Sequence, residues 1–261
     1  MLDSLFFLDF PENLRHTEFM KNESMENKEK TYYTDTDLHT HTIASGHATT
    51  DTIALLAKAA FLRGMKCLGI SDHGPASMGS AGLSYFRSLS LSPGERAGVE
   101  LLHGVEANIL DFSGSLDIPD SLLQTLDYGI ISMHRPIYTS GSVRENTLAY
   151  QKAMTHPRIK IIGHCDDSRF PVDYAELVRT ALEYRVVPEI NNVSLLPDSY
   201  RKNCRSNAIR LLSECERQGC PVILSSDSHG HLHIGDVTES WKLILETGFP
   251  AELVINPPIL P

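Results

Sequence analysis

The sequence has few cysteines, fewer basic than acidic residues, and no long apolar run. Its five cysteines form no C-x-x-C pair, so neither a disulfide framework nor a thiolate metal site is indicated. Lys and Arg total 23 against 33 Asp and Glu, which gives a formal net charge of -10. This excess of acidic residues argues against extensive electrostatic binding to nucleic acid or to an anionic membrane. No apolar run approaches the roughly 18 residues that a membrane-spanning helix needs.

The first residues of the chain carry no export signal that we recognise. The apolar segment Leu5–Leu8 is short, lies between two aspartates and has no basic flank, so it is a poor signal peptide. We therefore expect a cytoplasmic protein with reduced cysteines. The stretch 21–30 is almost wholly polar and charged, which predicts a solvated linker. Residues 1–33 are thus predicted to form an N-terminal extension, and residues 34–261 the folded domain.

From residue 34 onward, short apolar runs alternate with amphipathic stretches. Strands that alternate with helices predict βα units and a parallel sheet, and seven such units favour a closed α/β barrel over an open sheet. The predicted strands are 36–40, 67–71, 101–107, 128–133, 160–163, 186–190 and 221–225. The predicted helices are 51–63, 83–91, 120–126, 143–154, 173–184, 201–218 and 237–247.

Histidines are unusually frequent, with 12 in the chain, and many of them follow a predicted strand. In a barrel the carboxyl ends of all strands open onto one face, where active sites are built. Side chains that bind metals should therefore meet at that face. The candidates at or just after strand ends are His39, His41, His47, His73, Glu106, His134, His164, Asp227 and His229.

The spacing and chemistry of these candidates predict a metal site. His39 and His41 are two residues apart, so on an extended strand they point the same way and can bind one cation together. Glu106 has two carboxylate oxygens and can bridge two ions. Nine nitrogen and oxygen donors exceed what one ion can use, and two or three ions fit the count. Imidazole with carboxylate suits zinc, manganese or iron.

Seven segments carry a family resemblance. They are DLHTHTIASGHA (37–48), GISDHGP (69–75), GVEANI (104–109), SMHRP (132–136), IIGHCDD (161–167), PEINNVS (188–194) and SSDSH (225–229). In this order they resemble PHP-domain proteins, the polymerase and histidinol phosphatase superfamily. The GHA, DHGP, EANI and EINN details are most similar to its stand-alone bacterial phosphatases. The resemblance covers roughly residues 34–255 and implies a distorted (β/α)7, TIM-like barrel with phosphoesterase activity.

The resemblance also implies three divalent metal ions, with zinc favoured over manganese or iron. Glu106 would bridge the first ion and the second. The three ligand groups that it implies are His39, His41, Glu106 and Asp227; Glu106, His134 and His164; and His47, His73 and His229. The chain departs from the pattern at Arg135, where we expect an acidic residue, and at Cys165, where a proline is common. These departures leave the substrate open.

The expected chemistry is hydrolysis of a small phosphate monoester by a hydroxide that bridges two ions, with the third ion holding a phosphate oxygen. Glu106 and Asp227 serve this reaction as metal ligands. Asp72 is expected to orient a ligand histidine, and Arg135 to bind phosphate, ahead of Arg169 and Arg205. The expected partner is a small phosphorylated metabolite. Histidinol phosphate, nucleoside monophosphates and other phosphoesters are not separated by the sequence, and the oligomeric state stays open.

Two other functions compete with this prediction. The barrel of a metal-dependent amidohydrolase or deaminase also begins with an H-x-H pair. Such sites commonly need fewer ligands, so His47, His73 and His229 would have no role in metal binding. A non-catalytic PHP module that supports a polymerase is opposed by the acidic balance and by the complete set of ligand residues. A phosphate-release assay paired with metal analysis separates these alternatives.

Overall fold

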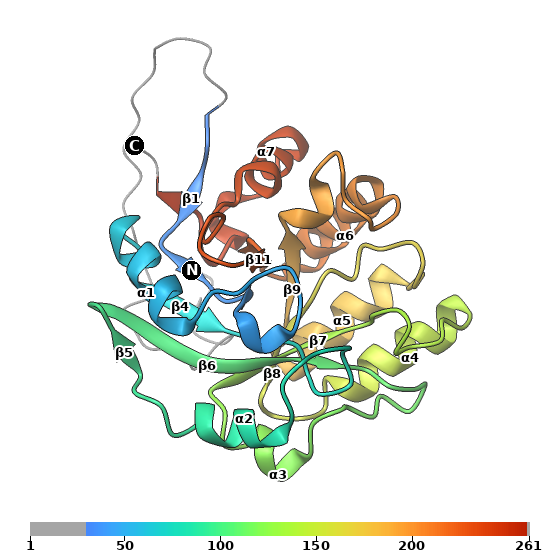
Figure 1. The fold of residues 1–261 in the computed structure, drawn as a ribbon. Helices are drawn as coiled ribbons and strands as arrows, with labels where there is room; N and C mark the ends of the chain where they lie inside the picture. The colour runs from blue at the N-terminus through green and yellow to red at the C-terminus, as the bar shows by residue number, and fades with distance from the viewer. Residues whose placement is uncertain (1–29, 260–261) are drawn as a thin grey trace.

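A seven-stranded parallel sheet curls around the centre of the computed structural model, which describes residues 30–259 (Figure 1). Hydrogen bonds link the strands in the order β10-β9-β8-β7-β6-β4-β2. The short β3 (Thr40–His41) pairs with β11 (Ser228–His229) and joins the first and last strand regions. The predicted seven-stranded α/β barrel is therefore confirmed. In sheet order the strands are Ile223–Ser225, Val187–Asn191, Ile159–Ile162, Tyr128–Ser132, Val99–Asn108, Cys67–Ile70 and Thr36–Asp37.

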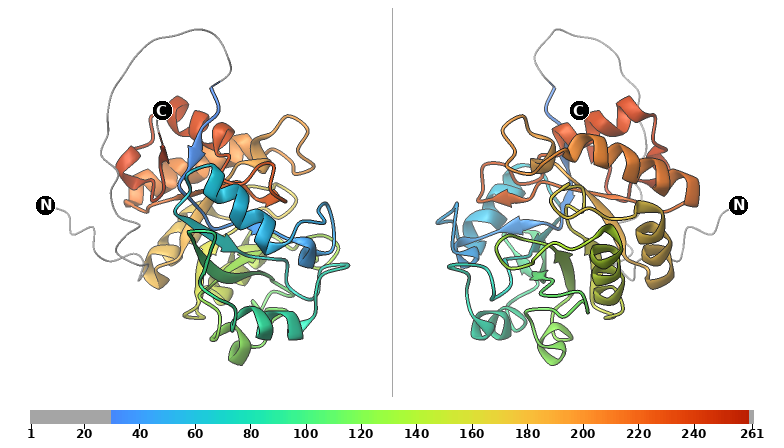
Figure 2. Two further views of the ribbon diagram at one scale, coloured as in Figure 1. Left: turned by 60° about the vertical axis from the view of Figure 1, so that its left-hand side comes forward. Right: turned by 90° about the vertical axis from the view of Figure 1, so that its right-hand side faces the viewer.

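Helices form where the amphipathic stretches predicted them, and recognisable caps set their ends. Ser142 and Glu145 make a capping box at the start of α4, and Gly219 ends α6 in the left-handed conformation. Figure 2 shows α4, α5 and α6 lying in succession along one flank of the barrel. The helices are α1 Ile53–Leu62, α2 Leu83–Leu89, α3 Asp120–Leu123, α4 Val143–Ala153, α5 Tyr174–Tyr184, α6 Cys204–Gln218 and α7 Thr238–Thr247.

Two apolar layers follow from the alternation of side chains along the strands. The larger layer packs the outer faces of the strands against the helices. The smaller one fills the inside of the barrel, where Tyr128 is fully buried and donates to the carbonyl of Leu38 at 2.6 Å. Gly104 leaves room for its ring, since a Cβ there would lie 2.6 Å from the Tyr128 ring. The interior residues are Leu38, Cys67, Tyr128, Ile130, Ile161, Val187 and Ile223.

The structure adds strands that the periodicity did not predict. The strand β1 (Tyr33–Thr34) pairs antiparallel with β12 (Pro258–Ile259), so the two ends of the described chain meet. The strand β5 (Glu95–Arg96) forms an antiparallel hairpin with β6. The predicted extension lies outside the described residues up to residue 29, and the domain boundaries stay a prediction. None of the helices between residues 30 and 259 has the length and apolarity to span a bilayer.

Candidate metal centre

All nine predicted metal-binding residues meet at the carboxyl ends of the strands. The rings of His41 and His229 lie 4.2 Å apart between centroids, and those of His41 and His73 lie 4.3 Å apart. This proximity follows from the β3–β11 pairing, which places His229 directly opposite His41. Residues from the first and last strands thus enter one cluster, although 188 positions of sequence separate His41 from His229.

Glu106 lies at the centre of this cluster and is fully buried. Its two carboxylate oxygens face different histidines. Oε1 lies 2.8 Å from Nε2 of His164, 3.3 Å from Nε2 of His134 and 3.4 Å from Nε2 of His39. Oε2 lies 2.5 Å from Nδ1 of His73, without hydrogen-bond alignment, and 3.8 Å from Nε2 of His41. Both oxygens therefore face imidazoles, as a bridging carboxylate requires, although Oε1 faces His39 together with His134 and His164, so the division differs from the ligand groups that the resemblance implies.

Asp227 approaches the same cluster from the loop between β10 and β11. Its backbone has φ of 52°, a left-handed conformation that is uncommon for aspartate. Its Oδ1 atom lies 3.1 Å from Nε2 of His41 and 3.6 Å from Nε2 of His39. Its Oδ2 atom points the other way, toward Arg201 and Asn191. Only one oxygen of Asp227 therefore faces the histidines.

His47, His73 and His229 lie together in the cluster, and His73 and His229 both stack on His41. Their ring centroids are 4.9 Å apart for the first two, and His229 lies 5.0 Å from His47 and 5.6 Å from His73. His47 is exposed, and its Nδ1 atom lies 3.1 Å from the carbonyl of Ser45. These three residues are the set that the family resemblance groups around a third ion.

Five of the histidines have an oxygen acceptor against Nδ1. An acceptor there holds the proton on Nδ1 and leaves the lone pair on Nε2 free for a metal, which is how metal-binding histidines are oriented. The Nδ1 contacts are His39 to Glu189 at 2.7 Å, His41 to Ser45 Oγ at 2.9 Å, His47 to Ser45 O at 3.1 Å, His134 to Asn108 Oδ1 at 2.8 Å and His229 to Asp227 O at 3.3 Å. The cluster is therefore built to present Nε2 atoms.

Asp72 acts on this arrangement through Ser45. The hydroxyl of Ser45 donates to Oδ1 of Asp72 at 2.7 Å, so its lone pairs remain to accept from Nδ1 of His41. Asp72 also accepts from the backbone N–H and hydroxyl of Thr42 and from the hydroxyl of Tyr85. The sequence suggested that Asp72 orients a ligand histidine, and the histidine that it reaches is His41.

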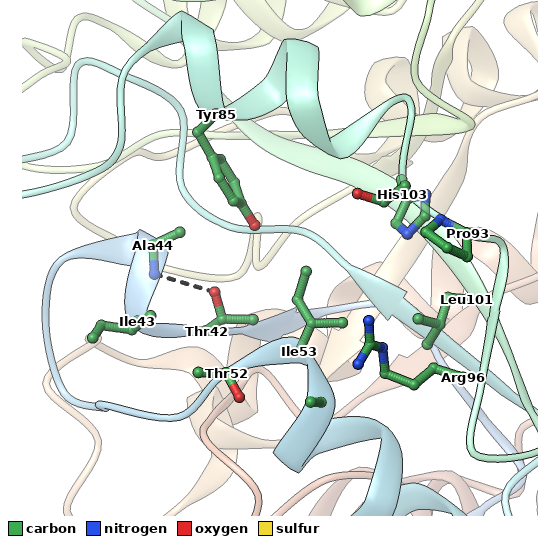
Figure 3. A pocket seen from close by; sticks show the side chains of 12 residues that line it. Thr42, Ile43, Ala44, Thr52, Ile53, Tyr85, Pro93, Arg96, Leu101 and His103 are labelled. Atoms are coloured by element: carbon green, nitrogen blue, oxygen red, sulfur yellow. Dashed lines mark hydrogen bonds between the residues drawn. The ribbon is translucent and has the colours of Figure 1, made fainter.

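Thr42 and Tyr85, which both bond to Asp72, also line a cavity of about 360 Å³ (Figure 3). Tyr85 points across it toward Thr42, and Ile53, Arg96 and Leu101 contribute further walls. None of the nine predicted metal-binding residues lines this cavity. The cavity and the metal centre are therefore separate, and Asp72 lies between them.

The donor atoms of the cluster fit divalent cations. Several buried polar atoms have no hydrogen-bond partner within residues 30–259, although nearly all buried polar atoms in proteins have one. Three of these atoms, Nε2 of His39, Oε2 of Glu106 and Nε2 of His229, point into the cluster. Cations among these atoms would satisfy the lone pairs and offset the buried negative charge.

The protonation states of Glu106, His41 and His164 also suit metal ligands. Burial raises the pKa of Glu106, but the facing histidines outweigh burial and hold it well below its usual value. Burial lowers the pKa of His41 well below its usual value, and burial together with Arg201 lowers that of His164 to about 4. The carboxylate is therefore charged and these two imidazoles are neutral near pH 7, which are the forms that bind cations.

The sequence analysis missed Ser45 and Asn108, which accept from His41 and His134, and two further supporting residues. Glu189 accepts from His39 and from the backbone N–H of His164, and Arg201 donates to Asp227. Glu189 had a visible signal, because a charged residue inside an apolar predicted strand must face a polar partner when buried. Arg201 had none, because the sequence predicted a helix that begins at this residue.

The arginines that the sequence favoured lie elsewhere. Arg135 is exposed and follows His134 directly, but within residues 30–259 its side chain makes no hydrogen bond or ion pair with the nine residues. Arg169 is committed to an ion pair with Asp167, and Arg205 pairs with Glu246 at the exposed surface. A phosphate-binding role for Arg135 stays a prediction.

Comparison with known proteins gives the following matches. The family model of the PHP domain matches residues 37–195. A probable phosphatase of Clostridium botulinum is 40% identical over 220 residues, which cover 84% of this chain and 89% of that protein. A probable phosphatase of Acetivibrio thermocellus is 38% identical over 220 residues, or 84% of this chain and 90% of that protein. The crystal structure of the histidinol phosphate phosphatase of Lactococcus lactis with zinc, L-histidinol and phosphate is similar in fold, with a TM-score of 0.55 at 17% identity over 82% of this chain and 94% of that one.

Proposed function

This chain belongs to the PHP domain family, as its motifs predicted, and on that premise we propose that it is a metal-dependent phosphatase for a small phosphate monoester. Relatives that are 38% and 40% identical and are named probable phosphatases support this activity. The observation that carries the proposal is the buried Glu106, whose two oxygens face separate groups of histidines. One carboxylate that serves two ligand groups is typical of a multinuclear hydrolytic site.

The proposed site holds three divalent ions, with zinc as the favoured metal because imidazole and carboxylate donors suit it. Manganese and iron are the alternatives. His47, His73 and His229 support a third ion because their ring centroids lie within 5.6 Å of one another. The proposed groups are His39, His41, Glu106 and Asp227; Glu106, His134 and His164; and His47, His73 and His229.

Such ions, when bound, would supply Lewis acidity toward a phosphoryl oxygen and a water of lowered pKa. The protein supplies the fixed geometry. Glu189, Ser45 and Asn108 keep protons on the Nδ1 atoms of their histidine partners, so the Nε2 lone pairs stay directed into the site. The buried frame around them cannot relax easily, which keeps the donors in place throughout turnover.

The proposal is tested by metal analysis together with a phosphate-release screen on the purified protein. We expect two or three transition-metal ions per chain, release of phosphate from a small monoester, and competition by inorganic phosphate. His73→Ala should greatly lower turnover of the monoester, because the third ion would bind the phosphate dianion. The ions bound by the other two groups of residues should still bind. A protein saturated with zinc or manganese that releases no phosphate, yet hydrolyses an amide or deaminates an amine, would make it an amidohydrolase.

A further inference from the structure

Arg201 is the buried cation behind the metal centre. Its side chain is 4% exposed, and it is the one Lys or Arg among residues 30–259 that is buried. The guanidinium bonds to three residues in two segments, one around the end of β9 and one after β10. Nη2 donates to Oδ2 of Asp227 at 2.9 Å, and Nη1 donates to Oδ1 of Asn191 at 3.1 Å and to Oγ of Ser194 at 3.2 Å.

The inward path of Arg201 depends on where α6 begins. The sequence predicted a helix from residue 201, but α6 starts at Cys204 because Asn203 has a left-handed backbone, with φ of 55°. Arg201 therefore lies in the loop between η3 (Val193–Leu195) and α6, free of helical geometry. The ring of Tyr200 covers the guanidinium, 5.1 Å from its central carbon. The loop thus buries the guanidinium of Arg201 next to Asp227.

We infer that Arg201 is a positioning residue that makes Asp227 a ligand through one oxygen. Its bond to Oδ2, together with that of Asn191 Nδ2 at 3.1 Å, fixes the carboxylate plane. Oδ1 is then the oxygen left to face Nε2 of His41 and His39. Without these donors the carboxylate can rotate about its Cβ–Cγ bond, and its lone pairs no longer aim at the site.

The same contacts argue against a direct role in binding substrate. Both terminal nitrogens of Arg201 already donate to protein oxygens, and the side chain is almost wholly buried. The negative charges nearby also hold it in place. Burial disfavours the guanidinium charge, but Asp227 outweighs burial and raises the pKa of Arg201 above its usual value. Arg201 is therefore a fixed part of the frame and not a free anion receptor.

This inference rests on the proposed metal site and is independent of which ester is hydrolysed. The test compares Arg201→Met and Arg201→Lys with Arg179→Met, a control that makes the same change at an exposed arginine of α5. Zinc is removed from each protein and added back against a competing chelator, which measures zinc affinity without turnover. Inhibition by inorganic phosphate and thermal unfolding of the metal-free protein are measured in parallel.

We expect Arg201→Met to hold at least one zinc ion about 10- to 100-fold more weakly, the effect typical of losing a partner of a metal ligand. Arg201→Lys should lie between, since one ammonium can replace the bond to Asp227 but not those to Asn191 and Ser194 together. Arg179→Met should match the parent protein. Phosphate inhibition of the zinc-saturated variants should be unchanged.

Two results would overturn the inference. If Arg201→Met folds and keeps zinc as tightly as the parent, or more tightly, Arg201 acts only as a counter-charge that zinc replaces. If zinc affinity is unchanged while phosphate inhibition weakens, Arg201 is a substrate-binding residue. Should Arg201→Met not fold, Arg201→Lys decides by the same zinc measurement, with a loss of affinity in support and parent-like affinity against.

Discussion

Replacing Glu189 by glutamine should damage zinc binding although the side chain keeps its shape. Glu189 is buried, and its Oε1 accepts from Nδ1 of His39 at 2.7 Å. Its Oε2 accepts from the backbone N–H of His164 at 2.8 Å and from Nδ2 of Asn191 at 3.1 Å. A carboxylate can accept all three bonds, whereas an amide has one accepting oxygen and one donating nitrogen.

Either orientation of the new amide fails. If the amide oxygen faces His164 and Asn191, the NH2 group must donate to His39, which moves the histidine proton to Nε2 and blocks that atom as a ligand. If the amide oxygen faces His39, the NH2 group meets two donors, and each unsatisfied buried group costs about 1–3 kcal/mol. Two such groups cost about 2–6 kcal/mol together, so at about 1.4 kcal/mol per tenfold change the variant should hold zinc at least about 30-fold more weakly.

The assay is competition for zinc between the protein and a chelator near pH 7, with turnover of a phosphate monoester as a second measurement. Glu183→Gln is the matched control, because it makes the same chemical change at a glutamate that is exposed on α5. The metal-free variant should still unfold cooperatively, since the side-chain volume is unchanged. A Glu189→Gln protein whose zinc affinity and turnover stay within about twofold of the control would refute the assignment of Glu189 as the residue that fixes the His39 proton.

Three further outcomes are expected. Glu106→Gln should lower turnover by orders of magnitude with the fold intact, because an amide cannot bridge two cations as a carboxylate can; near-normal turnover at full metal content would exclude the bridge. Removing residues 1–30 should leave metal content and phosphatase rate unchanged, because every predicted ligand lies at or after His39, and loss of activity in a folded truncation would show a contact with the site. Burial alone lowers the pKa of His39, but the charges of Glu189, Asp227 and Glu106 outweigh burial and hold it well above its usual value. In the metal-free protein at pH 7 this imidazole therefore carries a second proton, on Nε2. Zinc must displace this proton, so zinc affinity should fall as pH falls, and calorimetry in buffers of different ionisation heat should find about one proton released; no release would contradict the raised pKa.

Much of the site could be predicted because its residues belong to strand ends. Alternation along a strand directs His39 and His41 to the same side, and a parallel barrel brings successive strand ends to one face. Both rules are local or topological, so the nine residues were found without coordinates, and they do meet. The positions of strands and helices were predictable for the same reason, because apolar periodicity and helix caps depend only on residues that are close together in sequence.

The partners of those residues required the folded chain. The acceptor that fixes the His39 proton is Glu189, 150 positions away, and the donor that turns Asp227 is Arg201, which faces the site only because Asn203 delays the start of α6. The pairing of β3 with β11, which closes the barrel, covers only two residues on each strand and leaves no periodic signal. Which atoms could bind metal was therefore set by residue type and strand spacing. Where the protons lie, and which oxygen of Asp227 faces the site, was decided by contacts between distant segments, because a hydrogen bond depends on distance and direction in space and not on separation along the chain.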